Sequence, residues 1–531
     1  MKRLPVIIVG SGLAGIAAAQ ALLQRDLPVV MLDVGRQAAP DTIAFGEELA
    51  ALPSWQWSTK MRDRLISSTE AALSGVASKK WMGSDFASVL SGQLTTKLSH
   101  AWFYASEARC GLANIWGCGM LPMLAPDMAD WPISIADLEA HYREILQFVP
   151  LGGYHDALES SLPLYCNPQP APISSQGRSL LARMEKNREK LTKYGINFGA
   201  ARLAGDFAGT CGSGCQQCGM CMYGCPYGVL YSGQSTLSRL LGHESFHYIS
   251  DFVARSVEQQ NMKVLVHGVD HLGVPREPVM GSRVILCAGV PATTNIMLRT
   301  LRMYKRPVRI KTSELRFIPM LSFLSAGTIE HEAQSATCQA YWLLQDKKLC
   351  SHSIHFSLYG YNRLYLAALK NTFGKMYPAL ALPSAFLVRR LFFAFCFLHS
   401  DVSSELHAEL RDDAAETLYI SGIPSYIADD IFRKARRRLA KLSTATGLLP
   451  FPLYSGAKQP GEGNHLGGTF PMSKSPGVAE CDIAGRFHGL ERVHIADASC
   501  FPSITATTIT MSVMANAHRI ACHAATLEKN N

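Results

Sequence analysis

The amino-terminal hydrophobic pattern predicts a strand, a turn, a helix and a second strand. A short apolar run at 6–9 ends at a glycine-rich turn, and an Ala/Leu-rich stretch follows it to about Gln24. A second apolar run covers 29–32. Two strand-length runs on either side of a helix-length stretch are typical of a βαβ unit in a parallel sheet. The first run is too short for a signal-peptide core, so we expect no secretory signal.

The strand-and-turn pattern returns at 283–291, and we expect this strand to join the first sheet. The domain that contains both strands would then be discontinuous in sequence. From about 305 to 450 the pattern is irregular, with alternating stretches such as 353–358 that predict antiparallel strands. Early acids and late bases over 429–441 predict a helix aligned with its dipole, for which a solvated face is favoured over a partner site.

The most hydrophobic segment, 376–398, contains two prolines and the adjacent pair Arg389 and Arg390. Two arginines near the middle of a membrane span would cost about 5 to 7 kcal/mol on insertion scales, so a transmembrane helix is not expected. Two interpretations stay open. The segment packs in the core of the second domain, or it makes a peripheral membrane contact through a narrowly amphipathic helix over 384–398.

Composition changes this picture in three ways. At 531 residues, with 48% hydrophobic and 18% charged residues, the chain is an ordered protein of two domains. The net charge of +9 is modest and its basic stretches lack interleaved aromatic residues, which argues against nucleic acid as a partner. A basic surface also fits anionic lipid on the cytoplasmic face of a membrane, or an acidic redox partner. The 15 cysteines, without a secretory signal, indicate a cytoplasmic protein in which thiols and metal sites outnumber disulfides.

The glycine-rich turn has the G-x-G-x-x-G spacing of a dinucleotide-binding site. Gly10 would make the tight turn, Gly12 would let the backbone approach a pyrophosphate, and Gly15 would let helix and strand pack closely. The helix amino terminus would then hold the anion. Asp33 closes the βαβ unit, where a carboxylate accepts hydrogen bonds from a ribose. Because the motif lies between a predicted strand and a predicted helix, dinucleotide binding is favoured over a coincidental glycine turn.

A cysteine-rich run at 211–225 carries a second kind of chemistry. Its spacing C-x2-C-x2-C-x3-C, followed by proline, is that of bacterial ferredoxins and predicts a 4Fe-4S cluster on Cys215, Cys218, Cys221 and Cys225. Cys211 or a distant cysteine could replace Cys225, because the fourth cysteine of such a run ligates another cluster in two-cluster ferredoxins. Zinc is a weaker alternative, since zinc sites usually pair two C-x2-C turns across a longer loop. Free or disulfide-bonded thiols are the third alternative.

Further motifs follow one another along the chain in a fixed order. They are G-L-A-N-I-W-G-C-G at 111–119, D-W-P-I-S to L-E-A-H-Y at 130–142, L-C-A-G at 286–289, G-N-H-L-G-G-T-F-P-M at 463–472, V-H-I-A-D-A-S-C-F-P at 493–502 and M-A-N-A-H-R-I-A at 514–521. In this order they resemble the glucose-methanol-choline (GMC) flavin oxidoreductases. Only about 305–450 has no recognisable match.

The resemblance implies FAD as cofactor and an α/β fold. A discontinuous Rossmann-type FAD-binding domain would cover 1–130, 200–300 and 455–531, with the cysteine run inserted in it. An α+β substrate domain on an antiparallel sheet would cover 131–199 and 301–454. The implied FAD-binding residues are Gly10, Gly12, Gly15 and Asp33 at the adenosine half, Asn114, Trp116 and Gly117 near the isoalloxazine, Ala288 and Gly289 in the second flavin strand, and Asp497 and Ala498 near the pyrophosphate and ribityl chain.

The same resemblance implies that His465 takes the hydroxyl proton of an alcohol while a hydride moves to the flavin. An imidazole with a pKa near neutrality suits general-base work at physiological pH. The family usually has a second histidine or asparagine further on, and Thr508 occupies that position here. Threonine can orient the substrate oxygen but cannot act as a base at neutral pH. His465 would then transfer the proton alone.

Three functions follow from these features. In the first, an FAD-dependent dehydrogenase oxidises an alcohol, sugar or lipid-like substrate, and electrons leave one at a time through the cluster to a ferredoxin or a quinone. In the second, a ferredoxin drives reduction of an unsaturated or carbonyl substrate. In the third, the chain is an electron-carrier subunit, which the His465 motif argues against. The phenylalanines of the unmatched region favour a lipid-like substrate, although core packing explains them equally well: Phe386, Phe392, Phe393, Phe395 and Phe397.

Overall fold

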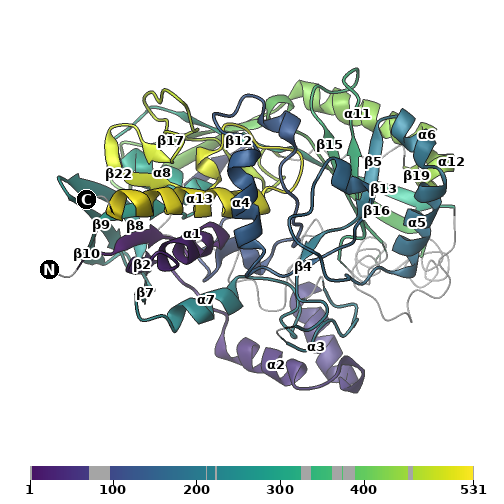
Figure 1. Ribbon diagram of the computed structural model, residues 1–531, viewed down its shortest axis with the longest axis horizontal. Helices are drawn as coiled ribbons and strands as arrows, with labels where there is room; N and C mark the ends of the chain where they lie inside the picture. The colour runs from purple at the N-terminus through teal and green to yellow at the C-terminus, as the bar shows by residue number, and fades with distance from the viewer. Residues whose placement is uncertain are drawn as a thin grey trace.

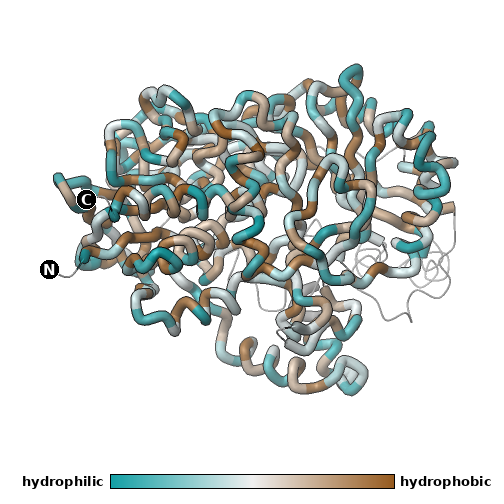
Figure 2. Tube along the Cα trace, in the orientation of Figure 1, coloured by the Kyte–Doolittle hydropathy of each residue, from teal (hydrophilic) through white to brown (hydrophobic). Residues whose placement is uncertain are grey.

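The computed structural model describes residues 3–70, 96–210, 212–221, 224–323, 337–360, 374, 389–451 and 459–529. It places a parallel sheet with its helices beside an antiparallel sheet with helices on its outer face (Figure 1). Both chain termini lie at the parallel-sheet end, and α2 and α3 project from one edge. Hydrophilic positions follow the outer helices of the antiparallel part (Figure 2).

The parallel sheet has the strand order β7-β2-β1-β11-β22, with β21 antiparallel at the β22 edge. This is the order of a dinucleotide-binding sheet. It confirms the predicted βαβ unit and the return of the chain to the same sheet near 283. Every residue of β1 and β11 is buried, because the helix at 13–23 and the antiparallel strands within 253–281 both pack against the sheet. The strands are β1 (Val6–Val9), β2 (Val29–Leu32), β7 (Phe246–Ile249), β11 (Arg283–Leu286), β21 (Arg486–Phe487) and β22 (Leu490–Ile495).

Helix α1 (Leu13–Leu23) lies between this sheet and the carboxyl-terminal helix α13 (Thr510–Lys529). It is apolar on almost every side, and such a helix is stable only when it is covered on every side. The small side chains of Ala17, Ala18 and Ala21 let its neighbours approach closely. Helix α4 (Ala136–Ile145) packs on the outer side of α13 and completes this stack of helices.

The second sheet is antiparallel throughout, in the order β19-β13-β16-β15-β14-β5, as the alternating pattern predicts. Helices α5 (Ser175–Lys186) and α11 (Tyr426–Lys441) bury their apolar sides against its outer face. Helix α11 begins three residues before the predicted start at 429, because Ser425 caps it. The strands are β5 (Ile196–Ala200), β13 (Leu315–Ser322), β14 (Ala340–Leu344), β15 (Ile354–Tyr359), β16 (Leu391–Phe397) and β19 (Leu448–Pro450).

Strand β16 occupies the described end of the hydrophobic segment at 376–398. It is the strand between β13 and β15, and most of its side chains are buried. A helix over 384–398 is therefore wrong for Leu391–Phe397, and core packing is confirmed for this stretch; 375–388 lies outside the described residues. None of the helices among the described residues is long and apolar enough to cross a membrane.

The remaining elements connect these two parts. A three-stranded antiparallel sheet, β10-β9-β8, follows β7. The strands of a five-stranded sheet, β20-β12-β17-β18-β3, alternate along the chain with strands of the two large sheets. Their bounds are β3 (Thr96–Ser99), β8 (Val253–Gln260), β9 (Lys263–Val269), β10 (Pro275–Gly281), β12 (Val308–Thr312), β17 (Glu405–Leu410), β18 (Leu418–Ile423) and β20 (Leu466–Gly467). The other helices are α2 (Pro40–Ala50), α3 (Thr59–Glu70), α6 (Arg188–Lys193), α7 (Gln234–Leu241), α8 (Val290–Thr300) and α12 (Ser443–Thr446).

A histidine between two carboxylates ties three distant segments together. Nε2 of His352 lies 3.1 Å from Oδ2 of Asp401, and its Nδ1 lies 3.5 Å from Oδ1 of the buried Asp127. Hydrogen bonds to Asp127 and Asp401 raise the pKa of His352 to about 9. The ring stacks on that of His399, with the centroids 3.7 Å apart. His352 is therefore a cation at neutral pH.

We expect the His352→Gln variant to lose thermal stability near pH 6 but little above pH 9. The folded pKa of about 9 lies above the ordinary value of 6.5, so the contribution of the imidazolium is full below pH 6.5 and is lost as the pH rises through 9. Melting temperatures between pH 5.5 and 9.5 measure this dependence. The exposed His247→Gln variant is the control, and an equal loss at both ends of the range would contradict the assignment.

Candidate active site

Each glycine of the turn after β1 has the surroundings that its predicted role requires. Gly10 has a φ of +100°, and an added Cβ would lie 2.5 Å from the carbonyl oxygen of Cys287. A Cβ on Gly15 would lie 2.0 Å from the carbonyl oxygen of Gly10, so helix and turn touch through their backbones. A Cβ on Gly12 would meet no atom within 4 Å. Gly12 therefore faces open space at the amino terminus of α1, where an anion binds favourably.

Asp33 follows β2 directly, at the same edge of the sheet. The hydroxyl of Ser11 and the phenol of Tyr248 both donate to its Oδ2, the latter at 2.8 Å. Burial raises the pKa of Asp33 to about 6, against the lowering effect of these hydrogen bonds. The backbone N–H of Cys110 donates to Oγ of Ser11 at 2.8 Å, which joins the start of the 111–119 motif to the glycine turn.

A second opening lies at the amino terminus of α8. Gly289 has a φ of +82°, and an added Cβ would again meet no atom within 4 Å. Asp497, at the end of β22, accepts hydrogen bonds from the N–H of Gly289 at 2.9 Å, the hydroxyl of Thr293 at 2.5 Å and the N–H of Ser499 at 2.9 Å. Burial raises the pKa of Asp497. Its carboxylate thus holds the α8 terminus against the strand end, and the buried Ala498 follows it.

The 111–119 motif forms a short 3-10 turn and a loop braced by its own side chains. The amide of Asn114 donates to the carbonyl oxygens of Arg109 at 2.9 Å and Gly111 at 2.7 Å. The indole N–H of Trp116 donates to the carbonyl oxygen of Tyr231 at 2.7 Å. Gly117 follows in the same loop.

The residues at this sheet edge fit FAD. Two helix amino termini with open glycines, Gly12 and Gly289, offer N–H groups to a pyrophosphate, and Asp33 offers a carboxylate to a ribose. The backbone of Ala288 lies beside Gly10, where the two strand ends meet. The predicted adenosine and pyrophosphate residues are thus brought together by the order of the strands.

His465 lies between β20 and the antiparallel sheet. Its ring stacks on Phe397 of β16, with centroids 5.0 Å apart and planes 20° apart. Its Nδ1 is buried and has no hydrogen-bond partner among the described residues. Burial lowers the pKa of His465 to about 4. The expectation of a pKa near neutrality is therefore wrong, because the desolvated ring disfavours the charged form.

Thr508 lies where the 111–119 loop meets the antiparallel sheet that contains β14. A Cβ on Gly119 would lie 2.8 Å from Cγ2 of Thr508 and 2.7 Å from the phenol oxygen of Tyr341. Oγ1 of Thr508 is buried and, within the described part of the chain, makes no hydrogen bond. The close approach of Gly119 places the loop, Thr508 and β14 against one another.

Two residues that sequence reasoning missed connect these positions. The buried ring of His355 lies 5.1 Å from that of Tyr341 and 6.2 Å from that of Phe397, which in turn contacts His465. Burial lowers the pKa of His355 to about 3, and its Nδ1 lacks a hydrogen-bond partner among the described residues. The only sequence signal was the alternation of 353–358, which placed His355 on one face of a strand with Ser357.

The four cysteines of the predicted cluster lie on a loop between two hydrophobic cores. The main core, which is the large hydrophobic core around the parallel sheet, contacts Cys215, Cys221 and Cys225. A small core contacts Cys218 and Cys221, and it consists of Phe45, Leu49, Trp57, Leu65 and Met220. Burial, with the neighbouring thiols, raises the pKa of Cys215 and Cys218 to about 12 and that of Cys225 to about 11. The structure contains no disulfide among the cysteines it describes, and Cys211 lies outside them.

This loop begins and ends within the part of the chain that packs beside the 111–119 motif. Its start is held by the N–H of Cys215, which donates to the carbonyl oxygen of Phe207 at 3.0 Å. After Cys225, the N–H of Tyr231 donates to the carbonyl oxygen of Ala204 at 3.2 Å, and the carbonyl of Tyr231 accepts the Trp116 indole. A hydrogen bond six residues after the last cysteine thus joins the cysteine run to the 111–119 motif.

Two comparisons with known proteins bear on this arrangement. A family model described as GMC oxidoreductase matches residues 427–517, which include His465, Asp497 and Thr508. The crystal structure of pyridoxine 4-oxidase from Mesorbium loti matches with a TM-score of 0.60 and 13% sequence identity, over 98% of this chain and 99% of that one. At this identity the likeness shows the fold alone. No curated protein matches the sequence. The family model thus matches the carboxyl-terminal part of the chain, and the fold likeness extends along its whole length.

Proposed function

We propose that this FAD-dependent oxidoreductase of CH-OH groups is a dehydrogenase in which His465 accepts the hydroxyl proton of an apolar alcohol. One observation carries the proposal. Nδ1 of His465, Oγ1 of Thr508 and Nδ1 of His355 are all buried without hydrogen-bond partners among the described residues, and they lie on residues linked by ring contacts and by the approach of Gly119. Buried polar atoms are normally paired, so unpaired ones mark a place for a ligand.

The residues act by orientation and by proton transfer. FAD, when bound, supplies the acceptor for a hydride. His465 is neutral at physiological pH and has a lone pair for the hydroxyl proton of the substrate. Thr508 would hold the substrate oxygen through a hydrogen bond, which leaves proton transfer to His465. Phe397 fixes the imidazole by stacking, so that the ring keeps one orientation.

The lining of the same sheet face indicates the substrate class. Phe395 lies 5.2 Å from Tyr359 and 5.4 Å from Phe317, and Phe317 stacks on Phe393 at 4.8 Å. These rings continue from the Phe397 side of His465 as an apolar strip. An aromatic strip binds apolar or aromatic molecules better than sugars, because it offers few hydrogen-bond groups. A panel of pyridoxine, an aromatic alcohol, a long-chain alcohol and a hexose would test this preference.

The cysteine loop is proposed to hold a 4Fe-4S cluster through Cys215, Cys218, Cys221 and Cys225. In a tetrahedral zinc site the sulfurs would be about 3.8 Å apart. Among the described residues, three or more candidate ligand atoms lie within 4.8 Å of one another at two places, and neither includes these cysteines. A cubane needs wider separations, because each sulfur binds a different iron.

Electron exit through this loop follows from its position. Such a cluster carries one electron at a time, so the partner would be a one-electron acceptor such as a ferredoxin or a quinone. The hydrogen bond from Trp116 to Tyr231 supports a connection to the flavin motif. Thiols kept reduced for a cluster are typical of the cytoplasm, which is the location that we propose. Assays with an artificial acceptor and with reduced ferredoxin would distinguish the dehydrogenase from the reverse, ferredoxin-driven reductase.

We expect Gly12→Val to lose FAD without losing the fold. A Cβ at Gly12 meets no protein atom, so the side chain would occupy the space proposed for the pyrophosphate. Flavin content and FAD affinity by calorimetry should fall at least about tenfold, which corresponds to roughly 1.4 kcal/mol. The melting temperature of the FAD-free protein should not change. Gly477→Val, at an exposed loop, is the control, and unchanged flavin content in Gly12→Val would contradict the proposed site.

Replacing His465 by Ala should lower kcat/KM by about 10²- to 10⁴-fold, the usual contribution of a general base. In the wild type, kcat/KM should rise as the pH passes about 4, where His465 loses its proton, and then stay level to neutral pH. Rates near pH 4 would be measured by stopped-flow pH jumps, so that the reaction is followed before the protein unfolds in acid. His488→Ala, at an exposed position, is the control. An acid limb near pH 6.5, or full activity without His465, would rule out this buried base.

Anaerobically purified protein should contain iron and acid-labile sulfide, and Cys218→Ser should lose both. The loss follows because a cubane needs each of its cysteine ligands. The measurements are iron and sulfide assays and electron paramagnetic resonance after reduction. Cys166→Ser, a thiol outside the loop, should keep wild-type iron. Iron-free wild-type protein would refute the cluster while leaving the FAD and His465 proposals standing.

A further inference from the structure

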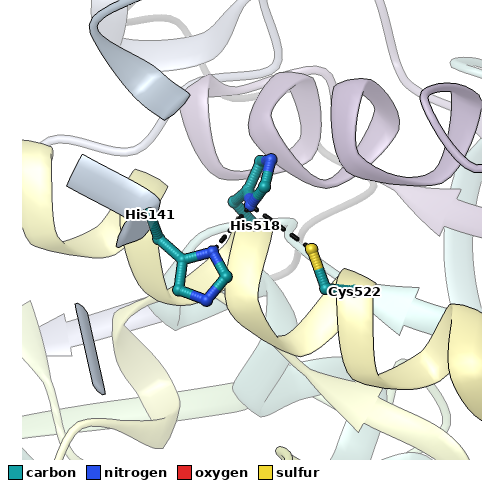
Figure 3. Close-up of side chains that lie close together, drawn as sticks. All are labelled: His141, His518 and Cys522. Carbon is teal, nitrogen blue, oxygen red and sulfur yellow. Dashed lines mark hydrogen bonds between the residues drawn. The ribbon is translucent and has the colours of Figure 1, made fainter. Parts of the chain in front are cut away.

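Helices α4 and α13 bring three metal-ligating side chains together, away from the candidate active site. His141 lies on α4, and His518 and Cys522 lie one turn apart on α13 (Figure 3). Nδ1 of His141 is 2.9 Å from Nδ1 of His518, which is 3.4 Å from Sγ of Cys522. All three atoms lie within 4.8 Å of one another. Arg25, just beyond the carboxyl end of α1, acts on all three residues, so the cluster lies toward that end and not at the glycine turn.

We propose that His141, His518 and Cys522 bind a soft metal ion, zinc(II) or copper(I). Bond lengths of 2.0–2.1 Å to nitrogen and 2.3 Å to sulfur with tetrahedral angles require about 3.3 Å between the nitrogens and about 3.6 Å between nitrogen and sulfur. The observed pairs need to open by only about 0.2 to 0.4 Å to reach these values. Two imidazoles and a thiolate are the donors that zinc and copper prefer.

The orientation of the rings agrees with a shared ion. The planes of His141 and His518 are tilted by 52°, with centroids 5.1 Å apart, so their in-plane lone pairs can converge. Nδ1 of His518 faces both the other ring and the sulfur, as Figure 3 shows. One imidazole nitrogen carries either one proton or one lone pair, so it cannot donate to both neighbours. An ion among the three atoms would accept a lone pair from each.

A second group of ligand atoms fails the same geometric test. Asp127, His352 and His399 also lie within 4.8 Å of one another. The rings of His352 and His399 are stacked, however, with planes only 8° apart and centroids 3.7 Å apart. Lone pairs of parallel rings cannot meet at one ion, because each lies in the plane of its own ring. His352 is also held between two carboxylates.

The surrounding charges favour copper(I) over zinc(II). The positive charge of Arg25 acts on all three residues, and that of Arg519 acts on His141 and Cys522. The negative charge of Glu144, three residues after His141 on α4, acts on Cys522. With one thiolate, copper(I) gives a neutral complex and zinc(II) a complex of charge +1. The two guanidinium groups disfavour the extra charge. Bound zinc would therefore depend more than bound copper(I) on the negative charge of Glu144.

The proposed ion would join chain segments that are 377 residues apart in sequence. Helix α13 begins two residues after Thr508, and α4 follows Trp131, whose indole donates to Ser503 at 2.8 Å. An ion that joins α4 to α13 would thus stabilise the two helices next to the segment that contains Thr508. Its role would be structural, because among the described residues the side-chain hydrogen bonds and ring contacts of the cluster join only α4 and α13.

The test uses the full-length protein and metal ions alone. The protein is stripped of zinc and copper with a chelator that leaves iron in place, and then titrated anaerobically with zinc(II) or copper(I) against a chromophoric competitor. We expect one equivalent of either metal to bind beyond the iron content, more tightly for copper(I), and to raise the melting temperature. Cys522→Ala should weaken this binding at least about 100-fold, since loss of even an outer-shell partner weakens metal binding 10- to 100-fold.

Matched variants separate this site from the cysteine loop. Cys218→Ser should lose iron and still bind one equivalent of zinc or copper. His141→Gln should keep its iron and lose the zinc or copper equivalent. Cys522→Asp should keep zinc but lose copper(I), because a carboxylate suits zinc and not a soft monovalent ion. If Cys522→Ala does not fold, His141→Gln gives the same test at a half-buried position. Equal zinc and copper binding by the wild type and these variants, or none in the wild type, would overturn the proposal.

Discussion

The contact between Gly15 and the carbonyl oxygen of Gly10 is the constraint on which the rest of the structure depends. A Cβ at Gly15 would lie 2.0 Å from that oxygen, so α1 can approach the end of β1 only without a side chain there. Because α1 lies so close to the sheet and is apolar on almost every side, α13 can cover it, and α4 can cover α13. The close contact of α1 with β1 therefore also fixes the position of α13. Thr508 lies just before α13, and His518 lies on it.

Strand register in the antiparallel sheet is the second constraint, because it decides which residues face the candidate active site. Along β16, Phe392, Ala394 and Cys396 belong to the outer core under α11, whereas Phe395 contacts the main core and Phe397 contacts His465. Side chains alternate between the faces of a strand, so a shift of one residue would exchange the two sets. The pairing of β16 with β15 then places His355 opposite Phe397. The candidate active site is thus a consequence of one register.

Elements that have a local pattern could be predicted, including the strand near 283 that returns to the first sheet, whereas side-chain contacts between distant elements could not. The strands at 6–9 and 29–32 and the roles of Gly10 and Gly15 follow from apolar runs and glycine spacing within thirty residues. His355 has no neighbouring motif, and only the sheet brings it to His465. The two ligands on α13 share a helix face by their spacing of four, but nothing near His141 indicates that it would meet them.

The low pKa of His465 is the clearest case in which three-dimensional packing changed the chemistry expected from the sequence. Among the described residues, burial is its cause and no carboxylate offsets it. If His465 takes the substrate proton as proposed, the resulting imidazolium would lack a protein counter-ion, and in a desolvated site an unpaired charge is strongly disfavoured. The positive charge of the imidazolium would then be balanced by the negative charge of the electrons that leave the substrate as it is oxidised. His465 would then hold its proton only while those electrons stay nearby, which couples release of the proton to departure of the electrons.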